Sequence, residues 1–162
     1  MSEEVLFHTL KPVFDLRSRV LILGSFPSPL SRSSHFYYGN PYNRFWRVIA
    51  KVTNEEVPTT IEEKKNLLFK HNIALWDVIA SCTIEGASDS SIKDVKVNDI
   101  SFILKNSQIE KIYANGSKAF ELYQKYIYQT TSIKAIKLPS TSPANCSFSE
   151  EKLVFCYSVI VK

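Results

Sequence analysis

The chain has 162 residues and a mass of 18.5 kDa, with 44% hydrophobic and 22% charged residues. This size and composition are typical of one globular domain, and they exclude a disordered chain, a collagen-like chain and a coiled coil. The formal net charge of +4 permits a nucleic-acid partner without requiring one, because a DNA-binding surface depends on local rather than total charge. We therefore expect residues 1–162 to form one domain.

The sequence carries no signal for a membrane segment, a metal site or a disulfide framework. No apolar run approaches the roughly 18 residues that a membrane helix needs, and the first residues lack the basic and apolar regions of a secretory signal. The cysteines Cys82, Cys146 and Cys156 stand far apart, with no CxxC pair and no cluster with histidine. We therefore expect a cytoplasmic protein without a metal or another cofactor.

Four short apolar segments predict buried strands. Their apolar character is continuous rather than alternating, which favours strands covered on both faces of a sheet. In chain order they are Arg19–Leu23, Ile73–Trp76, Ile109–Ala114 and Ile133–Leu138.

Segments with helical spacing of apolar residues lie between these strands and after the last one. Two starts match the capping-box pattern, Thr60 with Glu63 and Ser147 with Glu150. Because strands alternate with helices, the sequence predicts a three-layer α/β/α sandwich around a four-stranded, mainly parallel sheet. The predicted helices are Asn43–Val52, Thr60–Lys70, Asn98–Lys105, Ser117–Tyr128 and a last one within 151–161.

The segments that follow the strands are polar or rich in turn residues. In an open parallel sheet the ligand lies beyond the carboxyl ends of the strands, so these segments are the place to search for a site. They read GSFPSPLS, DVIASC, NGSK and PSTSPAN. None of them is a Walker A loop or a dinucleotide-binding glycine motif. We further expect Ser81–Asp94 to be a polar loop that closes over the site.

Six aromatic residues lie within 36–46, interrupted by Gly, Asn and Pro. Core packing accounts for Phe45 and Trp46, which belong to the predicted helix. It accounts less well for Tyr37, Tyr38 and Tyr42, which belong to a loop. Loop aromatics beside amides are suited to stacking on a planar ligand such as a nucleobase.

The segment after the last strand predicts a rigid turn with exposed hydroxyls. Pro139 and Pro143 fix the backbone, and Ser140, Thr141 and Ser142 lie between them. Hydroxyl and backbone N–H groups in such a turn are able to hold phosphate oxygens. A solvated turn without a ligand is the alternative.

The motifs GSFPS, FYYGNPYNRFWRVI and LPSTSPAN, in this order on an α/β chain, resemble the uracil-DNA glycosylase superfamily. Within it they are most similar to the hypoxanthine-DNA glycosylase (DNA-deoxyinosine glycosylase) branch. The resemblance runs from about Arg19 to the C-terminal helix and implies one such domain over residues 1–162. It implies a monomer that flips a deaminated base out of DNA and hydrolyses the N-glycosidic bond in base excision repair. Hypoxanthine is the first expected base, with uracil and xanthine as alternatives.

The resemblance also implies a catalytic residue. Phe26 occupies the position where many branches carry an Asp or Asn that positions water, so this role passes to Asn43 of the second motif. An amide is able to orient water or bind the base, although it is not a strong general base. The alternative for Asn43 is the N-cap of the following helix. Asn40 stands where relatives often carry His.

Four residues are expected at the base, and six at the DNA backbone. The resemblance implies that Tyr38 stacks on the flipped base and that Phe26 packs on its other side. Asp77 would accept the N1–H of hypoxanthine, and Asn115 would donate to O6; local turn and capping roles are the alternatives for both. The predicted DNA contacts are Ser28, Arg44, Lys118, Ser140, Thr141 and Ser142.

Two other functions remain open at this point. Phe26 in the first motif is also compatible with a nucleic-acid-binding protein of the same fold that has no catalytic activity. An enzyme that acts on free nucleosides or nucleotides is the third option.

Overall fold

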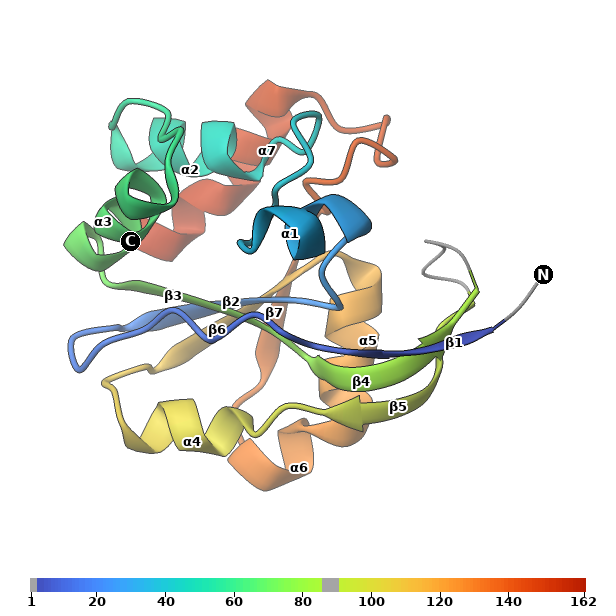
Figure 1. The fold of residues 1–162 in the computed structure, drawn as a ribbon. Coiled ribbons are helices and arrows are strands. Elements are labelled where there is room, and N and C mark those ends of the chain that lie inside the picture. The colour runs from blue at the N-terminus through green and yellow to red at the C-terminus, as the bar shows by residue number, and fades with distance from the viewer. Residues whose placement is uncertain (1–2, 86–90) are drawn as a thin grey trace.

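The central element is a parallel sheet. The computed structural model describes residues 3–85 and 91–162. Four strands pair in the order β3-β2-β6-β7, all parallel (Figure 1). The predicted four-stranded parallel sheet is thereby confirmed. Its strands are β2 (Val20–Gly24), β3 (Ile73–Asp77), β6 (Lys111–Asn115) and β7 (Ala135–Leu138).

The continuous apolar character of the strands follows from burial on both faces. In β2, Val20 and Ile22 belong to one hydrophobic cluster, whereas Leu21 and Leu23 belong to the other. Since successive side chains of a strand point to opposite faces, both faces of the sheet are covered.

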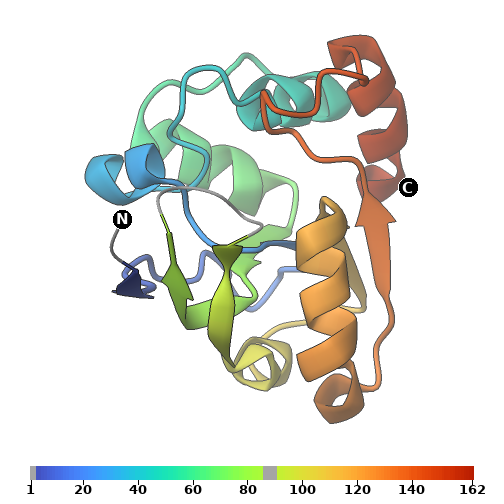
Figure 2. The ribbon, with the colours of Figure 1, turned by 90° about the vertical axis from the view of Figure 1, so that its right-hand side faces the viewer.

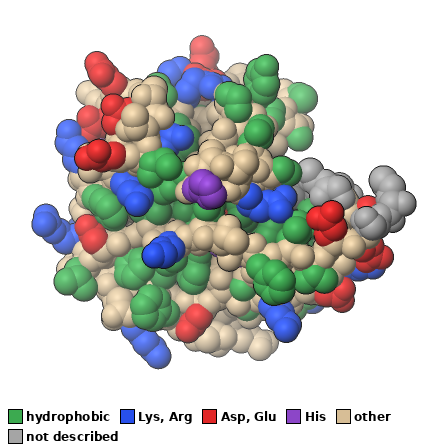
Figure 3. Space-filling model, viewed as in Figure 1, with side chains coloured by type: hydrophobic (Ala, Val, Ile, Leu, Met, Phe, Trp, Pro, Cys, Tyr) green, Lys and Arg blue, Asp and Glu red, His purple; other side chains and the backbone are tan. Residues whose placement is uncertain are grey.

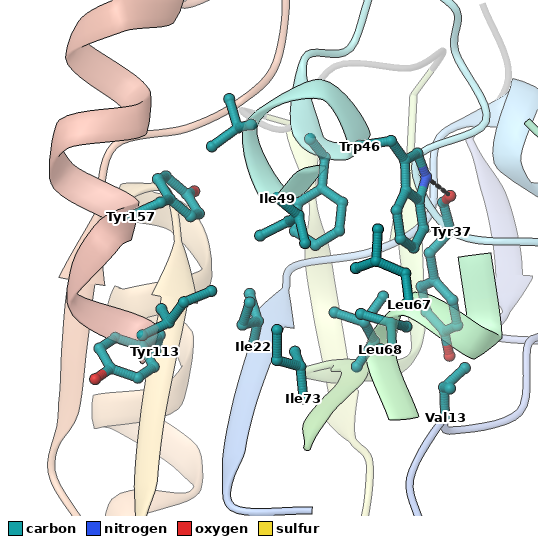
Figure 4. Close-up of a cluster of buried hydrophobic side chains, with 14 of the residues drawn as sticks. Val13, Ile22, Tyr37, Trp46, Ile49, Leu67, Leu68, Ile73, Tyr113 and Tyr157 are labelled. Carbon is teal, nitrogen blue, oxygen red and sulfur yellow. Dashed lines mark hydrogen bonds between the residues drawn. The ribbon is translucent and has the colours of Figure 1, made fainter. Parts of the chain in front are cut away.

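Three helices cover one face of the sheet: α2 (Phe45–Thr53), α3 (Ile61–Lys70) and α7 (Glu150–Tyr157) (Figure 1). Figure 4 shows part of this core, where Ile49, Leu68 and Tyr157 pack with the sheet residues Ile22, Ile73 and Tyr113. The short helix α1 (Pro29–Ser34) follows β2, and the 3-10 turn η2 (Ser158–Val161) follows α7.

Three further helices cover the opposite face, which completes the predicted three layers (Figure 1). The longest of them, α5, packs against β6 and β7, and Figure 2 shows it beside β7. Leu122 and Tyr123 of α5 and Ile103 of α4 are buried in the hydrophobic cluster on this face. The helices are α4 (Ile100–Lys105), α5 (Ser117–Tyr126) and α6 (Tyr128–Thr131).

A second, antiparallel sheet was not predicted from the sequence. It has the order β1-β4-β5, and β4 begins two residues after β3 ends. Its outer strands β1 and β5 are largely exposed, and β4 mixes apolar residues with Ser and Thr, so none of them has the continuous apolar run of the central strands. The expected polar loop Ser81–Asp94 is therefore partly strand, and residues 86–90 of it lie outside the described residues. The strands are β1 (Glu4–Phe7), β4 (Ile79–Ile84) and β5 (Lys93–Val97).

The helix starts show which capping pattern operates. At α3 the Thr60 side chain accepts from the Glu63 N–H and the Glu63 carboxylate accepts from the Thr60 N–H, as predicted. At α7 the cap is Ser149, whose hydroxyl accepts from the Lys152 N–H, so the prediction of Ser147 was wrong. The Ser147 hydroxyl instead donates to Asn145.

In the described ranges, no helix has the length and apolar character needed to cross a membrane.

Glu150 joins α7 to α2 by charge, and this contact predicts a pH dependence. Hydrogen bonds from Arg47 and then Lys51 hold the pKa of the Glu150 carboxyl below its ordinary value. A lowered pKa in the folded state stabilises at pH values above the ordinary glutamate pKa, about 4.3, and the effect is lost as pH falls through the lowered value.

We expect Glu150→Gln to lower the free energy of unfolding by about 0.5–1 kcal/mol at pH 7, measured by urea denaturation. The difference from the wild type should shrink as pH falls through the lowered pKa of the Glu150 carboxyl and vanish once this group is protonated. Glu151→Gln is the control, because Glu151 is exposed on the same first turn of α7. A difference that persists unchanged at pH 3 would contradict the ion pair as its cause.

Candidate functional site

A pocket of about 510 Å³ lies where the strands of the central sheet end. The segments after β2 and β7 line it together with the last residues of β3 and β6, so the predicted strand ends converge. Arg44 and Lys118 are the two predicted site residues that do not line it. Those that do are Phe26, Ser28, Tyr38, Asn43, Asp77, Asn115, Ser140, Thr141 and Ser142.

The floor of the pocket depends on Gly24. This residue ends β2 and pairs in register with Asp77, which ends β3. A Cβ atom at Gly24 would lie 2.4 Å from Asp77 Oδ1 and 3.2 Å from the Tyr38 hydroxyl oxygen. Only glycine permits this approach, so the carboxylate and the phenol lie directly over its backbone.

Asp77 is buried, with 4% of its surface exposed, and its partner was not predicted from the sequence. Its Oδ2 lies 2.8 Å from Nε2 of His8, whose side chain is 3% exposed. The two residues are separated by 69 positions, and no local pattern in the sequence links them. His8 follows strand β1 and is held to β4 by the hydrogen bond from its N–H to the Ala80 carbonyl.

The loop tyrosines Tyr37 and Tyr38 stay protonated. Burial raises the pKa of both hydroxyls, and the negative charge of Asp77 raises it further. A hydrogen bond from Asn115 opposes this shift at Tyr38 but does not reverse it. The pocket therefore contains neutral phenols beside one buried carboxyl group.

Tyr38 lies where it was predicted, at the pocket. Its ring stacks on Phe45 with 4.0 Å between centroids and 17° between planes. Its backbone has φ of 54°, a left-handed conformation that turns the chain between α1 and α2. Because Phe45 covers one face of the ring, only the other face remains for a base.

The other two loop tyrosines differ from the expectation. Tyr37 is 2% exposed and belongs to the core: its hydroxyl donates to the Lys11 carbonyl, and its own carbonyl accepts from the Trp46 indole N–H (Figure 4). Tyr42 is 76% exposed and does not line the pocket. Of the three, Tyr38 alone combines pocket lining with a partly exposed ring.

Asn43 lies at the pocket and supports the start of α2, but the N-cap of this helix is Arg44, so the capping alternative for Asn43 was wrong. Its Oδ1 accepts the Phe45 N–H at 2.9 Å, so the oxygen supports the start of α2. The helix begins at Phe45, two residues later than predicted. Within the described residues the Nδ2 of Asn43 makes no hydrogen bond, and the residue lines the pocket. The amide nitrogen therefore remains available to a ligand.

Asn115 and Thr141 form the wall between β6 and the loop after β7. Nδ2 of Asn115 donates to the Tyr38 hydroxyl at 3.2 Å and to the Thr141 hydroxyl at 3.1 Å, and its Oδ1 accepts from the Thr141 N–H. To donate to a base, the Asn115 amide would first have to give up one of its hydrogen bonds to Tyr38 or Thr141. Thr141 is fully buried, so a phosphate contact by its side chain would require the loop to open.

Arg44 holds the same loop. Its guanidinium donates to the carbonyls of Ser142, Asn145 and Phe148, and its N–H donates to the carbonyl of Thr141. The planar group, with five donors, is thus occupied by protein carbonyls. The phosphate contact of Arg44 stays a prediction, and the structure adds a role in fixing the loop.

The remaining predicted residues lie at the rim. The Ser28 hydroxyl caps α1, and the hydroxyls of Ser140 and Ser142 each accept a backbone N–H of their own turn. Lys118 is half-buried in the first turn of α5, outside the pocket. The Phe26 ring lines the pocket and meets the His8 ring edge to face at 6.0 Å.

Positive charge is distributed rather than concentrated on the face seen in Figure 3. Lys and Arg side chains lie apart there, with Asp and Glu among them. At the pocket itself, the Arg32 guanidinium lies 5.7 Å from the centroid of the Phe26 ring. Its Nε is buried without a hydrogen-bond partner.

We expect Arg44→Lys to release the loop, because a single ammonium group cannot reach all three carbonyls. Amide hydrogen exchange within 140–148 should accelerate about tenfold, as expected for the loss of one to two hydrogen bonds. Arg19→Lys is the control, since Arg19 forms an exposed pair with Glu110. Unchanged exchange at 140–148 would contradict this role and favour a simple phosphate contact, which lysine preserves.

Comparison with known proteins agrees with this geometry. The model of the uracil DNA glycosylase superfamily matches residues 11–158. A protein of Methanosarcina acetivorans named hypoxanthine DNA glycosylase is 39% identical over 145 residues, covering 86% of this chain and 89% of its own. One of the same name from Methanosarcina barkeri is 36% identical over 113 residues, 68% of this chain and 71% of its own.

A solved structure has the same fold over nearly the full length. The solution NMR structure of a candidate uracil DNA glycosylase from Methanosarcina acetivorans superimposes with a TM-score of 0.81. The two sequences are 33% identical, and the match covers 97% of this chain and 99% of the other. Since the family model spans residues 11–158 and both named relatives are at least 36% identical, this protein belongs to the uracil DNA glycosylase superfamily.

Proposed function

We propose that this protein is a monofunctional DNA glycosylase that releases a deaminated base, first of all hypoxanthine, from DNA in base excision repair. The observation that carries the proposal is the meeting of Asn43, Tyr38 and Asp77 in one pocket at the strand ends. The volume of about 510 Å³ lies within the range of small-molecule sites and accommodates a single extruded nucleotide. The names of the two Methanosarcina relatives support hypoxanthine as the base.

The reaction requires charge stabilisation more than a strong base. When the N-glycosidic bond breaks, positive charge develops on the sugar and negative charge on the leaving base. A fixed donor next to the departing base, or one that orients the attacking water, lowers the barrier. Nδ2 of Asn43 supplies this donor in the proposal, and its orientation is fixed because Oδ1 is bound to the Phe45 N–H.

Base recognition uses the other side of the pocket. The free face of Tyr38 stacks on the extruded base, with Phe26 on its opposite side. Asp77 accepts the N1–H of hypoxanthine. Extrusion costs a few kcal/mol and is easiest at a mismatched pair, which adds selectivity before the pocket is reached.

The DNA backbone is held at the rim in this proposal. Ser140 and Ser142 contact phosphates on one side of the pocket, and Ser28 on the other, with Lys118 beyond it. We propose further that the protein acts as a monomer in the cytoplasm. Affinity for DNA should fall as salt rises, because phosphate contacts release counterions.

A panel of labelled duplexes tests the function. Duplexes that contain hypoxanthine, uracil or xanthine are incubated with the protein, and abasic sites are then cleaved with alkali. We expect strand cleavage for hypoxanthine and none for undamaged DNA. Tight binding of these duplexes without abasic product would establish the non-catalytic alternative, and release of bases from free nucleosides alone would establish the third.

Two substitutions at Asn43 separate catalysis from support of the start of α2. Asn43→Ser retains an oxygen acceptor for the Phe45 N–H, whereas Asn43→Ala removes it. We expect both to reduce base release by at least 100-fold in single-turnover assays. Only Asn43→Ala should also lower the free energy of unfolding, by about 1 kcal/mol. Full activity in Asn43→Ser would refute the catalytic assignment.

A further inference from the structure

The side chain of His8 is buried and polar, although its position in the fold would also suit an apolar residue. Its imidazole is packed between aromatic rings, with centroids 6.0 Å from Phe26, 6.2 Å from Tyr37 and 6.4 Å from Trp76. An apolar side chain would fill such a site without the cost of burying a polar group. His8 also precedes residue 11, where the match to the family model begins. Its polar contact is with Asp77.

His8 holds one oxygen of the carboxylate, and Gly24 leaves room for the other. Nε2 of His8 bonds Oδ2. Oδ1 lies close to Gly24, which lines the pocket. Because an ionised carboxylate only accepts hydrogen bonds, Nε2 of His8 carries the hydrogen in this pair. The other groups near the carboxylate are the hydroxyls of Tyr37 and Tyr38, both protonated. Asp77 therefore presents an acceptor to the pocket.

An acceptor at this position distinguishes deaminated bases chemically. In adenine the ring nitrogen N1 carries a lone pair, and after deamination to hypoxanthine it carries a hydrogen. The same change occurs at N3 when cytosine becomes uracil. A buried carboxylate gains a charge-assisted hydrogen bond from the N–H and meets repulsion from the lone pair.

We propose that His8 is a positioning residue for specificity: through its hydrogen bond to Asp77 it holds the carboxyl group in the orientation that accepts the ring N–H created by deamination. This inference rests on the proposed function and extends it to a residue outside the matched region. Without the His8 contact, the Asp77 carboxyl group loses the hydrogen bond that orients it, so its acceptor oxygen is no longer held toward the ring N–H. Loss of His8 should thus weaken discrimination more than binding.

The experiment measures binding, so that it does not depend on catalysis. Two duplexes carry a 2′-fluorine, which slows bond cleavage, at either a hypoxanthine or an unsubstituted purine nucleotide. Purine keeps the N1 lone pair. We expect the wild type to bind the hypoxanthine duplex on the order of 10- to 100-fold more tightly. His8→Leu should reduce this ratio at least fivefold, whereas His8→Gln, which retains a side-chain N–H donor, should recover part of it.

Two further variants make the test specific. Asp77→Asn should reduce the ratio as much as His8→Leu, and the double variant should lose no more, because both act through one hydrogen bond. His71→Leu is the matched control: His71 bonds Glu55 at 2.6 Å, and neither residue lines this pocket. If His8→Leu does not fold, His8→Phe, which keeps a ring but has no N–H donor, replaces it under the same criteria.

The outcomes separate this inference from the proposed function. An unchanged ratio in the folded His8 variant overturns the inference, and so does an equal loss of affinity for both duplexes, which indicates a structural role only. A reduced ratio in the His71 control would also overturn it. Absence of abasic product from the wild type on every lesion overturns the proposed function instead, whatever the binding ratios are.

Discussion

The close approach of Asp77 to Gly24 is the constraint on which the pocket depends. Parallel pairing of β2 and β3 places the two residues side by side at the strand ends, and the missing side chain of Gly24 lets the carboxylate lie over the backbone. The Tyr38 hydroxyl oxygen also lies close to Gly24, 3.2 Å from the position that a Cβ atom would occupy. A buried carboxylate is costly unless it is hydrogen-bonded, and His8 provides the bond. Sheet register, loop conformation and the N-terminal segment are therefore coupled at one point.

A second set of hydrogen bonds holds the opposite wall of the pocket, which is formed by the loop after β7. The loop after β7 exposes backbone carbonyls that need donors, and Arg44 supplies them from the residue before α2. Asn115 at the end of β6 bonds both the loop and Tyr38. Side chains for which the sequence predicts DNA contacts thus also build the loop that would grip DNA. Such dual use is economical in a small domain, because a rigid loop loses less entropy when it binds a backbone.

The sequence predicted the central sheet and its covering helices because burial on both faces leaves a continuous apolar run in each strand. It did not predict β1 and β5, whose residues are largely exposed, or β4, whose buried apolar residues alternate with Ser and Thr. All but two of the predicted site residues line the pocket, since strand ends in a parallel sheet converge. The contact of His8 with Asp77 behind the pocket was not predicted, because the two residues are 69 positions apart and the antiparallel pairing of β1 with β4 brings them near. Tyr37 was misjudged for a related reason: a loop residue became core through a contact with Lys11.

The position of negative charge in the pocket bears on how a glycosylase of this kind works. The first motif carries Phe26 where other branches place a polar residue, so the described carboxyl group of the pocket comes from β3 rather than from the end of β2. In the proposed mechanism that carboxylate binds the edge of the base, and the sugar side is left to the amide of Asn43. A full negative charge at the base edge would oppose charge accumulation on the leaving group unless the ring N–H shields it. In this proposal, the hydrogen bond that selects a deaminated base is also what makes Asp77 compatible with departure of that base, so one contact would join base selection to catalysis.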